Sequence, residues 1–213
     1  MALIGRTMVA ALFLPGCLIA MMTLATTAPG AEPPRMETLQ FDSKRSSAQF
    51  SVKVFWMIPV DGQFGGLRGE VVVDHFSSQA RVDARIDADG VTMRRSAYEN
   101  WVKSAEFFDV ERYPEIRFHS DSFPISRLHG GGDLPGVLTM RGIEQSVLFQ
   151  VQPSTCDRPA IDCDVMADGT VRRSEFGMTT RRASLSDKVE LSFSVRIVAP
   201  AARAPEPMTR PPQ

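Results

Sequence analysis

Apolar and polar residues alternate over much of the chain, and this pattern constrains the fold more than any other feature. In residues 80–88 and 189–197 every second residue is apolar, and the residues between them are charged or serine. Residues 48–56 alternate for most of their length. A period of two is typical of a β-strand with one face in a core and the other in water. The sequence therefore predicts an all-β domain.

Weaker alternation raises the predicted number of strands to about eight. The additional candidate strands are residues 67–74, 116–123, 137–141, 147–151 and 165–173. Strands with one apolar face must cover that face in a sandwich or a closed barrel. Of these two arrangements, an eight-stranded antiparallel barrel would also remove unpaired sheet edges by closure. Its interior is either just filled by side chains or able to hold one small ligand.

One stretch has helical spacing. Tyr98, Trp101, Val102 and Ala105 fall at positions i, i+3, i+4 and i+7, which predicts a short helix over residues 94–106. We expect this helix to cap one mouth of the barrel.

The two ends of the chain differ in composition from the domain between them. Arg6 precedes an uncharged apolar run, which is followed by a segment rich in Ala and Thr that is typical of a cleavage region. This order predicts a cleaved export signal over residues 1–31. A retained membrane anchor and lipidation of Cys17 are the alternatives. Residues 200–213 are rich in proline and are predicted to be disordered. The folded domain is therefore expected over residues 32–199, in a periplasmic or secreted protein.

Cys156 and Cys163, with six residues between them, are the cysteines left after removal of the signal. An even pair in an exported chain predicts a disulfide. Two inert thiols or a metal site are the alternatives, but this spacing is unusual for zinc and no histidine lies nearby.

Charge and motifs argue against two classes of function. The formal net charge is −1, so no basic excess would hold nucleic acid. The sequence contains three histidines, and it lacks the hydrolase, metalloprotease and phosphate-loop motifs. Asp83 and Asp87 alternate with Arg81 and Arg85, which indicates a solvated face with ion pairs rather than an acid–base pair. We expect no enzyme activity, no catalytic residue, no bound metal and no cofactor.

Several motifs occur in a recognisable order. They are Ser47–Lys53, Lys103–Asp109, Tyr113–Ser120, Gly136–Gly142 and Arg173–Met178. Together they resemble the YceI-like family of exported lipid- and polyisoprenoid-binding proteins, over roughly residues 38–198. The resemblance implies a lipocalin-like barrel whose tunnel holds a long isoprenoid, such as a quinone tail or a polyprenyl lipid. It is compatible with transient membrane contact and with a homodimer.

Strand parity and the resemblance together predict the residues that line this tunnel. They are Phe50, Val52, Val54, Trp56, Ile86, Trp101, Phe108, Phe118, Leu138, Met140, Phe149, Val171, Arg173, Phe176, Met178, Leu191 and Phe193. Small inward residues such as Ala84 would leave the tube incompletely filled. Any one of the aromatic residues taken singly is better explained as ordinary core. Arg173 is expected either to meet a head group or to pair with Glu175 or Asp187 at the rim.

The sequence departs from the family at polar positions near the entrance. Val54, Tyr98, Glu99 and Trp101 stand where relatives commonly carry histidine or an Arg-Asp pair, so we expect a more hydrophobic entrance. Three functions follow: a carrier of isoprenoid lipids, a lipid isomerase or hydrolase using Arg173, Glu175 and Asp187, or a stress-related interaction protein with a packed barrel.

Overall fold

A computed structural model describes residues 36–181 and 183–198 of the chain. The predicted signal over residues 1–31, the lipidation of Cys17 and the disordered tail over residues 200–213 lie outside these residues. They stay predictions.

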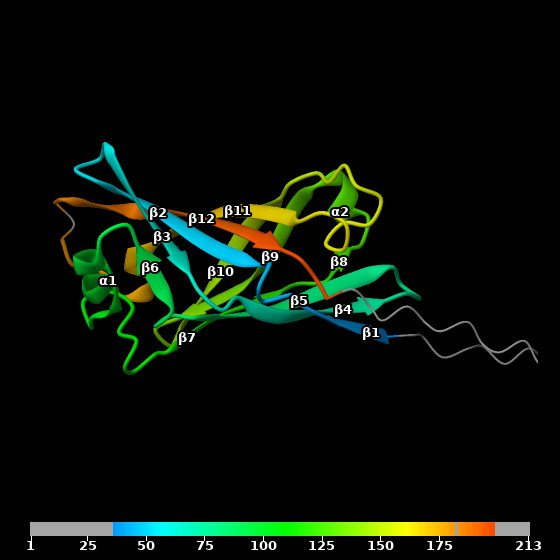
Figure 1. The fold of residues 1–213 in the computed structure, drawn as a ribbon, viewed down its shortest axis with the longest axis horizontal. Helices are drawn as coiled ribbons and strands as arrows, with labels where there is room; N and C mark the ends of the chain where they lie inside the picture. The colour runs from blue at the N-terminus through cyan, green and yellow to red at the C-terminus, as the bar shows by residue number, and fades with distance from the viewer. Residues whose placement is uncertain (1–35, 182, 199–213) are drawn as a thin grey trace, which may run out of the picture. The chain divides into compact units, whose positions relative to one another are not determined.

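Twelve strands of one antiparallel sheet dominate the described residues (Figure 1). The strands are β1 (Met36–Gln40), β2 (Ser47–Val54), β3 (Ile58–Phe64), β4 (Arg68–Asp74), β5 (Gln79–Asp87), β6 (Val91–Met93), β7 (Glu115–Ser120), β8 (Phe123–Pro124), β9 (Gly132–Met140), β10 (Ile143–Val151), β11 (Val165–Arg172) and β12 (Leu185–Val195). The helices are α1 (Ser96–Lys103), α2 (Arg127–Gly130) and the 3-10 helix η1 (Arg173–Phe176).

Two bent segments explain how twelve strands make one barrel. β3 and β4 are successive parts of one segment, and β5 and β6 are successive parts of another. β3 pairs with β6, and β4 pairs with β5. Between the two pairs, the Gly65 amide donates to the Gly90 carbonyl at 2.9 Å. Because β2 pairs with both β12 and β3, the pairing passes around the whole barrel. The predicted all-β antiparallel barrel architecture is confirmed, but the described residues form twelve strands rather than eight, because two segments are each divided by a bend and β1 and β8 are short additions.

Glycines permit the bend between β3 and β4. Gly66 has φ +67°, a left-handed conformation that glycine adopts without steric cost. At Gly69 a Cβ would fall 2.4 Å from the Asp83 carbonyl oxygen, so only glycine allows β4 to approach β5 this closely. Before the bend, β3 pairs with β2. After the bend, β4 pairs with β1 instead.

The outer face of the barrel carries the charges that alternation predicted. On β5 and β7, Arg85 Nε lies 3.2 Å from Asp83 Oδ1, and Arg117 Nη2 lies 2.9 Å from Glu115 Oε2. These side chains are at least partly exposed, so they form a solvated ion-pair face. The apolar side chains of the same strands point into the barrel.

Helix α1 lies at one end of the barrel, while α2 and the loop before β11 lie at the other (Figure 1). The helix is shorter than the predicted 94–106. It ends at Lys103 because the Ser104 backbone turns to an extended conformation, with ψ 167°. The Ser104 hydroxyl also donates to the Trp101 carbonyl at 2.7 Å, which occupies a carbonyl at the end of the helix.

Candidate functional site

The interior of the barrel is hollow in two places. The lid chamber, beside α1, has a cavity volume of about 160 Å³. The far chamber, toward α2, has a cavity volume of about 520 Å³. Ile86, Ile116, Leu138 and Phe193 line both chambers, and we call these four residues the waist.

The side chains that line the chambers lie at the inward positions of the alternating strands. Val52, Val54, Val82 and Phe118 point inward, yet each is only partly buried, because one side of each faces a hollow instead of another side chain. Inward apolar residues in a filled barrel would be fully buried. The interior therefore has room for an apolar guest, as incomplete filling by small residues predicted.

Aromatic side chains form the wall of the lid chamber near α1. The rings of Phe50, Phe64 and Phe108 lie in mutual contact, with centroids 5.2–6.0 Å apart. Trp101 packs edge-on against Phe107 at 4.5 Å. Tilted and edge-on contacts of this kind stabilise a wall by about 0.5–1.5 kcal/mol per pair. These rings form part of the chamber wall at the helix end.

Polar contacts hold Trp101 in place. Its indole Nε1 donates to Glu106 Oε2 at 2.7 Å, and Arg181 Nε donates to Glu106 Oε1 at 3.0 Å. The Arg181 guanidinium also lies 4.8 Å from the Trp101 ring centroid. The hydrogen bonds from Trp101 and Arg181 outweigh desolvation and hold the pKa of Glu106 below its ordinary value. We call Trp101, Glu106 and Arg181 the latch, because they join the α1 segment to the loop before β12.

Arg173 lines the lid chamber but is only 2% exposed. Its guanidinium donates to the carbonyls of Met178, Leu185 and Ser186 at 2.6, 3.1 and 2.9 Å. Asp187 in turn accepts from the amide and the hydroxyl of Ser174. These contacts connect η1 to the start of β12, so the structure gives Arg173 a role in holding this part of the wall.

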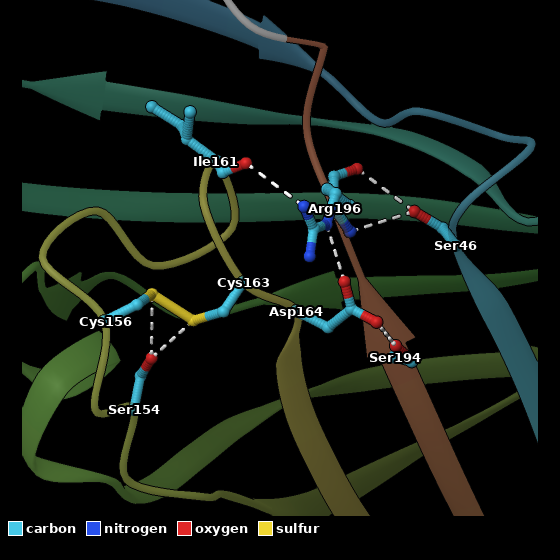
Figure 2. A network of polar contacts seen from close by, with 8 residues as sticks. All are labelled: Ser46, Ser154, Cys156, Ile161, Cys163, Asp164, Ser194 and Arg196. Atoms are coloured by element: carbon cyan, nitrogen blue, oxygen red, sulfur yellow. Dashed lines mark hydrogen bonds and ion pairs between the residues drawn. A yellow bond between two sulfur atoms is a disulfide. The ribbon is translucent and has the colours of Figure 1, made fainter.

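The loop between Cys156 and Cys163 covers the end of the far chamber. The predicted disulfide is present, with Cα atoms 6.2 Å apart, and Ser154 Oγ lies 2.9 Å from Cys163 Sγ (Figure 2). Pro159, Ala160 and Ile161, inside this loop, line the chamber. The disulfide therefore constrains part of the chamber wall.

Arg196 anchors the same loop to β12 and β2 (Figure 2). Its guanidinium donates to the Ile161 carbonyl at 3.3 Å and to Asp164 Oδ1 at 2.6 Å. Ser46 bonds to the Arg196 backbone at 3.0 and 3.1 Å. Burial raises the pKa of Asp164, but hydrogen bonds from Arg196 and Ser194 prevail and leave it lowered. The charged form of Asp164 is thus part of the closure.

The structure brings most of the predicted lining residues together. Those at the lid chamber are Phe50, Val52, Val54, Ile86, Trp101, Phe108, Leu138, Met140, Val171, Arg173, Met178, Leu191 and Phe193. Phe118 and Phe149 line the far chamber, which Leu138 and Phe193 also reach. Contact of these residues with a ligand stays a prediction.

Two predicted lining residues lie outside both chambers. Trp56 is 64% exposed, so its expected inward position is wrong. The alternation that placed it inward stops at Val54, where β2 ends and a turn begins. Phe176 is fully buried in η1 and packs in the core without reaching a hollow.

The sequence analysis missed residues on strands with weak patterns. Val60 and Phe64 on β3 line the lid chamber, and Leu39 and Val71 line the far chamber. The short alternation Val60-Gly62-Phe64 was the available signal for β3. The run Val71-Val72-Val73 hides the alternation of β4.

The rim of the far chamber is its polar part. His75 Nε2 lies 2.7 Å from Glu37 Oε2, and both residues line the chamber together with Arg117. Within residues 36–181 and 183–198, no three His, Cys, Asp or Glu side chains are grouped to hold a metal. None of the helices in this described part is long and apolar enough to cross a bilayer.

Comparisons with known proteins agree with this architecture. A family model described as a YceI-like domain matches residues 39–197. A UPF0312 protein of Staphylococcus aureus strain USA300 is 25% identical over 172 residues, which cover 78% of this chain and 96% of that protein.

Two solved structures share the fold. Burkholderia cenocepacia BcnA has a TM-score of 0.61 at 21% identity, with 73% of this chain and 98% of that chain covered. A polyisoprenoid binding domain from Saccharophagus degradans, implicated in plant cell wall breakdown, has a TM-score of 0.56 at 13% identity. That match covers 78% of this chain and 100% of that chain.

Proposed function

Because the chain belongs to the YceI-like family, we propose that it is an exported protein that sequesters or carries a long-chain isoprenoid lipid of the quinone or polyprenyl type. The single observation that carries this proposal is the pair of apolar chambers along the barrel interior. No further cofactor is proposed.

The size and chemistry of the chambers support a lipid guest. The far chamber, at about 520 Å³, lies within the 300–1,000 Å³ typical of ligand pockets. Apolar cavities hold water poorly, and each buried methylene contributes roughly 0.8 kcal/mol. A chain of isoprene units would therefore bind through its length, with few polar contacts.

The neighbouring fold from Saccharophagus degradans supports the class of lipid. That protein is described as a polyisoprenoid binding domain. We extend the same ligand class to this chain because its interior is walled by Val, Leu, Ile, Met and Phe. Val54, Tyr98 and Trp101 line the lid chamber, which supports the expected hydrophobic entrance.

The arrangement of the polar groups predicted for an enzyme, Arg173, Glu175 and Asp187, favours binding over catalysis. Arg173 and Asp187 are engaged in the hydrogen bonds that connect η1 to β12. Glu175 is exposed, and its backbone carbonyl accepts a hydrogen bond from Gln145 Nε2 at 3.1 Å. A general acid or base must reach its substrate within hydrogen-bond distance, and neither carboxylate lines a chamber.

The disulfide supports export, because disulfides persist mainly in oxidising compartments. We propose a periplasmic or secreted location on this ground and on the predicted signal at residues 1–31.

The test is detergent-free purification from the native host, followed by native mass spectrometry and organic extraction. We expect an isoprenoid lipid at one copy or fewer per protein, and uptake of added quinone by the extracted protein. Recovery of no lipid together with no uptake would overturn the proposal. Recovery of a chemically altered lipid after incubation would replace it with the enzyme hypothesis.

A further inference from the structure

The turn between β2 and β3, together with the first residue of β3, exposes four consecutive large apolar side chains. Phe55, Trp56, Met57 and Ile58 are 60%, 64%, 79% and 57% exposed, and we call them the apolar turn. Figure 1 shows this turn at the same end of the barrel as α1. Single exposed apolar residues are common, but a contiguous exposed group marks an interaction site.

The local backbone does not explain why these residues are apolar. Phe55 and Trp56 have φ +48° and +65°, a region in which glycine, asparagine and aspartate are favoured in hairpin turns. The Phe55 amide donates to the Ser184 carbonyl at 2.7 Å, so the turn is held in place. Aromatic residues at these positions are unfavourable for the turn itself, which indicates that they contact something other than this chain.

The apolar turn borders the mouth of the lid chamber. Phe55 and Ile58 line a surface groove together with Arg94, Arg95 and Asp61. The residues that line both the groove and the lid chamber are Gln49, Val54, Val60, Met93 and Tyr98. A lipid that leaves or enters the lid chamber on this side passes the apolar turn.

The charges in the groove match a lipid surface. Arg94 and Arg95 are exposed, and the Arg95 guanidinium lies 5.8 Å from the Tyr98 ring centroid. Asp61 leaves the three charged groups with a net positive charge. Arginine beside exposed aromatic residues is typical of segments that bind at the interface of an anionic bilayer.

We propose that the apolar turn inserts into an anionic lipid bilayer, with Arg94 and Arg95 at the phosphates, so that the mouth of the lid chamber opens on the membrane. A second copy of the chain is disfavoured as the occupant. A two-fold contact centred on Arg94 and Arg95 would bring the like charges of both copies together. The role of membrane docking in lipid exchange rests on the proposed function, but binding to the bilayer is measured without any isoprenoid.

The first experiment measures flotation of the purified protein with vesicles of phosphatidylcholine mixed with phosphatidylglycerol, and with vesicles of phosphatidylcholine alone. We expect binding to the mixed vesicles that weakens with salt. The double variant Phe55→Ser/Trp56→Ser should reduce partitioning by about tenfold or more, since two large apolar side chains no longer leave water. Phe76→Ser is the matched control, because Phe76 is 84% exposed on the β4–β5 turn and should not alter binding.

Charge and fluorescence variants test the orientation. Arg94→Gln/Arg95→Gln should abolish the preference for phosphatidylglycerol. The emission of Trp56 should shift to the blue on vesicle binding, and Trp56→Phe should remove this shift while flotation persists.

Three results would overturn the proposal: no flotation, equal loss in the Phe76→Ser control, or self-association that the double variant abolishes while flotation is unchanged. Uptake of a quinone is measured separately on the double variant without vesicles. Loss of flotation with retained uptake supports docking. Absence of uptake in the parent protein, together with recovery of no lipid from it, would refute the proposed function and leave the flotation result standing.

Discussion

Adding a phenyl ring to the wall of the far chamber separates a hollow barrel from a filled one. Ala84 is half-buried on β5 and lines the far chamber. Ala48 on β2 is 1% exposed and lines neither chamber. Ala84→Phe and Ala48→Phe therefore make the same chemical change at a hollow site and at a packed site.

The two variants should differ in stability. Overpacking a filled core typically lowers the free energy of unfolding by about 1–3 kcal/mol, and we expect Ala48→Phe to fall in this range. The far chamber of about 520 Å³ can accept the ring, so Ala84→Phe should change the free energy of unfolding by less than about 1 kcal/mol. Urea denaturation followed by tryptophan emission measures both values.

The ligand should respond in the opposite sense. The new ring at Ala84 displaces about one isoprene unit, or about five buried carbons at roughly 0.8 kcal/mol each. If the guest recovers some contact with the ring, the loss is about 3 kcal/mol, or roughly a hundredfold in Kd. Competition with a fluorescent quinone analogue measures the change.

Two results would refute this reasoning. Equal destabilisation by Ala84→Phe and Ala48→Phe would mean that the far chamber is filled. Unchanged affinity in a stable Ala84→Phe variant would mean that the guest does not occupy it.

Three further predictions concern the latch, the disulfide and Arg173. The folded pKa of Glu106 is lowered by the hydrogen bond from Trp101 and its other donors, so its stabilisation is present above about pH 4.3 and is lost as pH falls through the folded value. Acid should therefore loosen the latch and shift tryptophan emission; a Glu106→Gln variant with the same acid transition would contradict this. Replacing Cys156 and Cys163 by serine should lower the free energy of unfolding by about 2.5 kcal/mol, seen as a lower Tm, and an unchanged Tm would count against a constraining role. Arg173→Met should destabilise by about 3 kcal/mol or more in urea, because buried carbonyls lose their donor; a stable variant with changed lipid selectivity would instead support a head-group role.

Local alternation was sufficient to predict much of the barrel. The strand expected at residues 80–88 is β5, and that expected at residues 189–197 overlaps β12, because both lie with one face in the core and one in water. Strand β3 was missed because proline at position 59 is uncommon in a strand and Gly62 carries no apolar side chain, so the alternation Val60-Gly62-Phe64 is short and weak. Trp56 was misplaced because alternation cannot show where a strand stops and a turn begins.

The division of the interior was beyond sequence reasoning. The residues Ile86, Ile116, Leu138 and Phe193 come from four different strands, and their meeting depends on barrel register. The latch depends likewise on contact between segments 75 residues apart in the chain. Parity could predict which side chains point inward, but it could not predict which of them meet.

The waist has a consequence for stoichiometry. A guest shorter than one chamber can occupy either side of the waist, so a short-chain prenyl alcohol should bind with two copies per protein and two unequal affinities. A guest that spans both chambers must thread between the four waist side chains, so it should bind as a single copy. Its exchange should be slow and governed by rotamer changes of those side chains. Chain length would then select both the number of guests and the time that each remains bound.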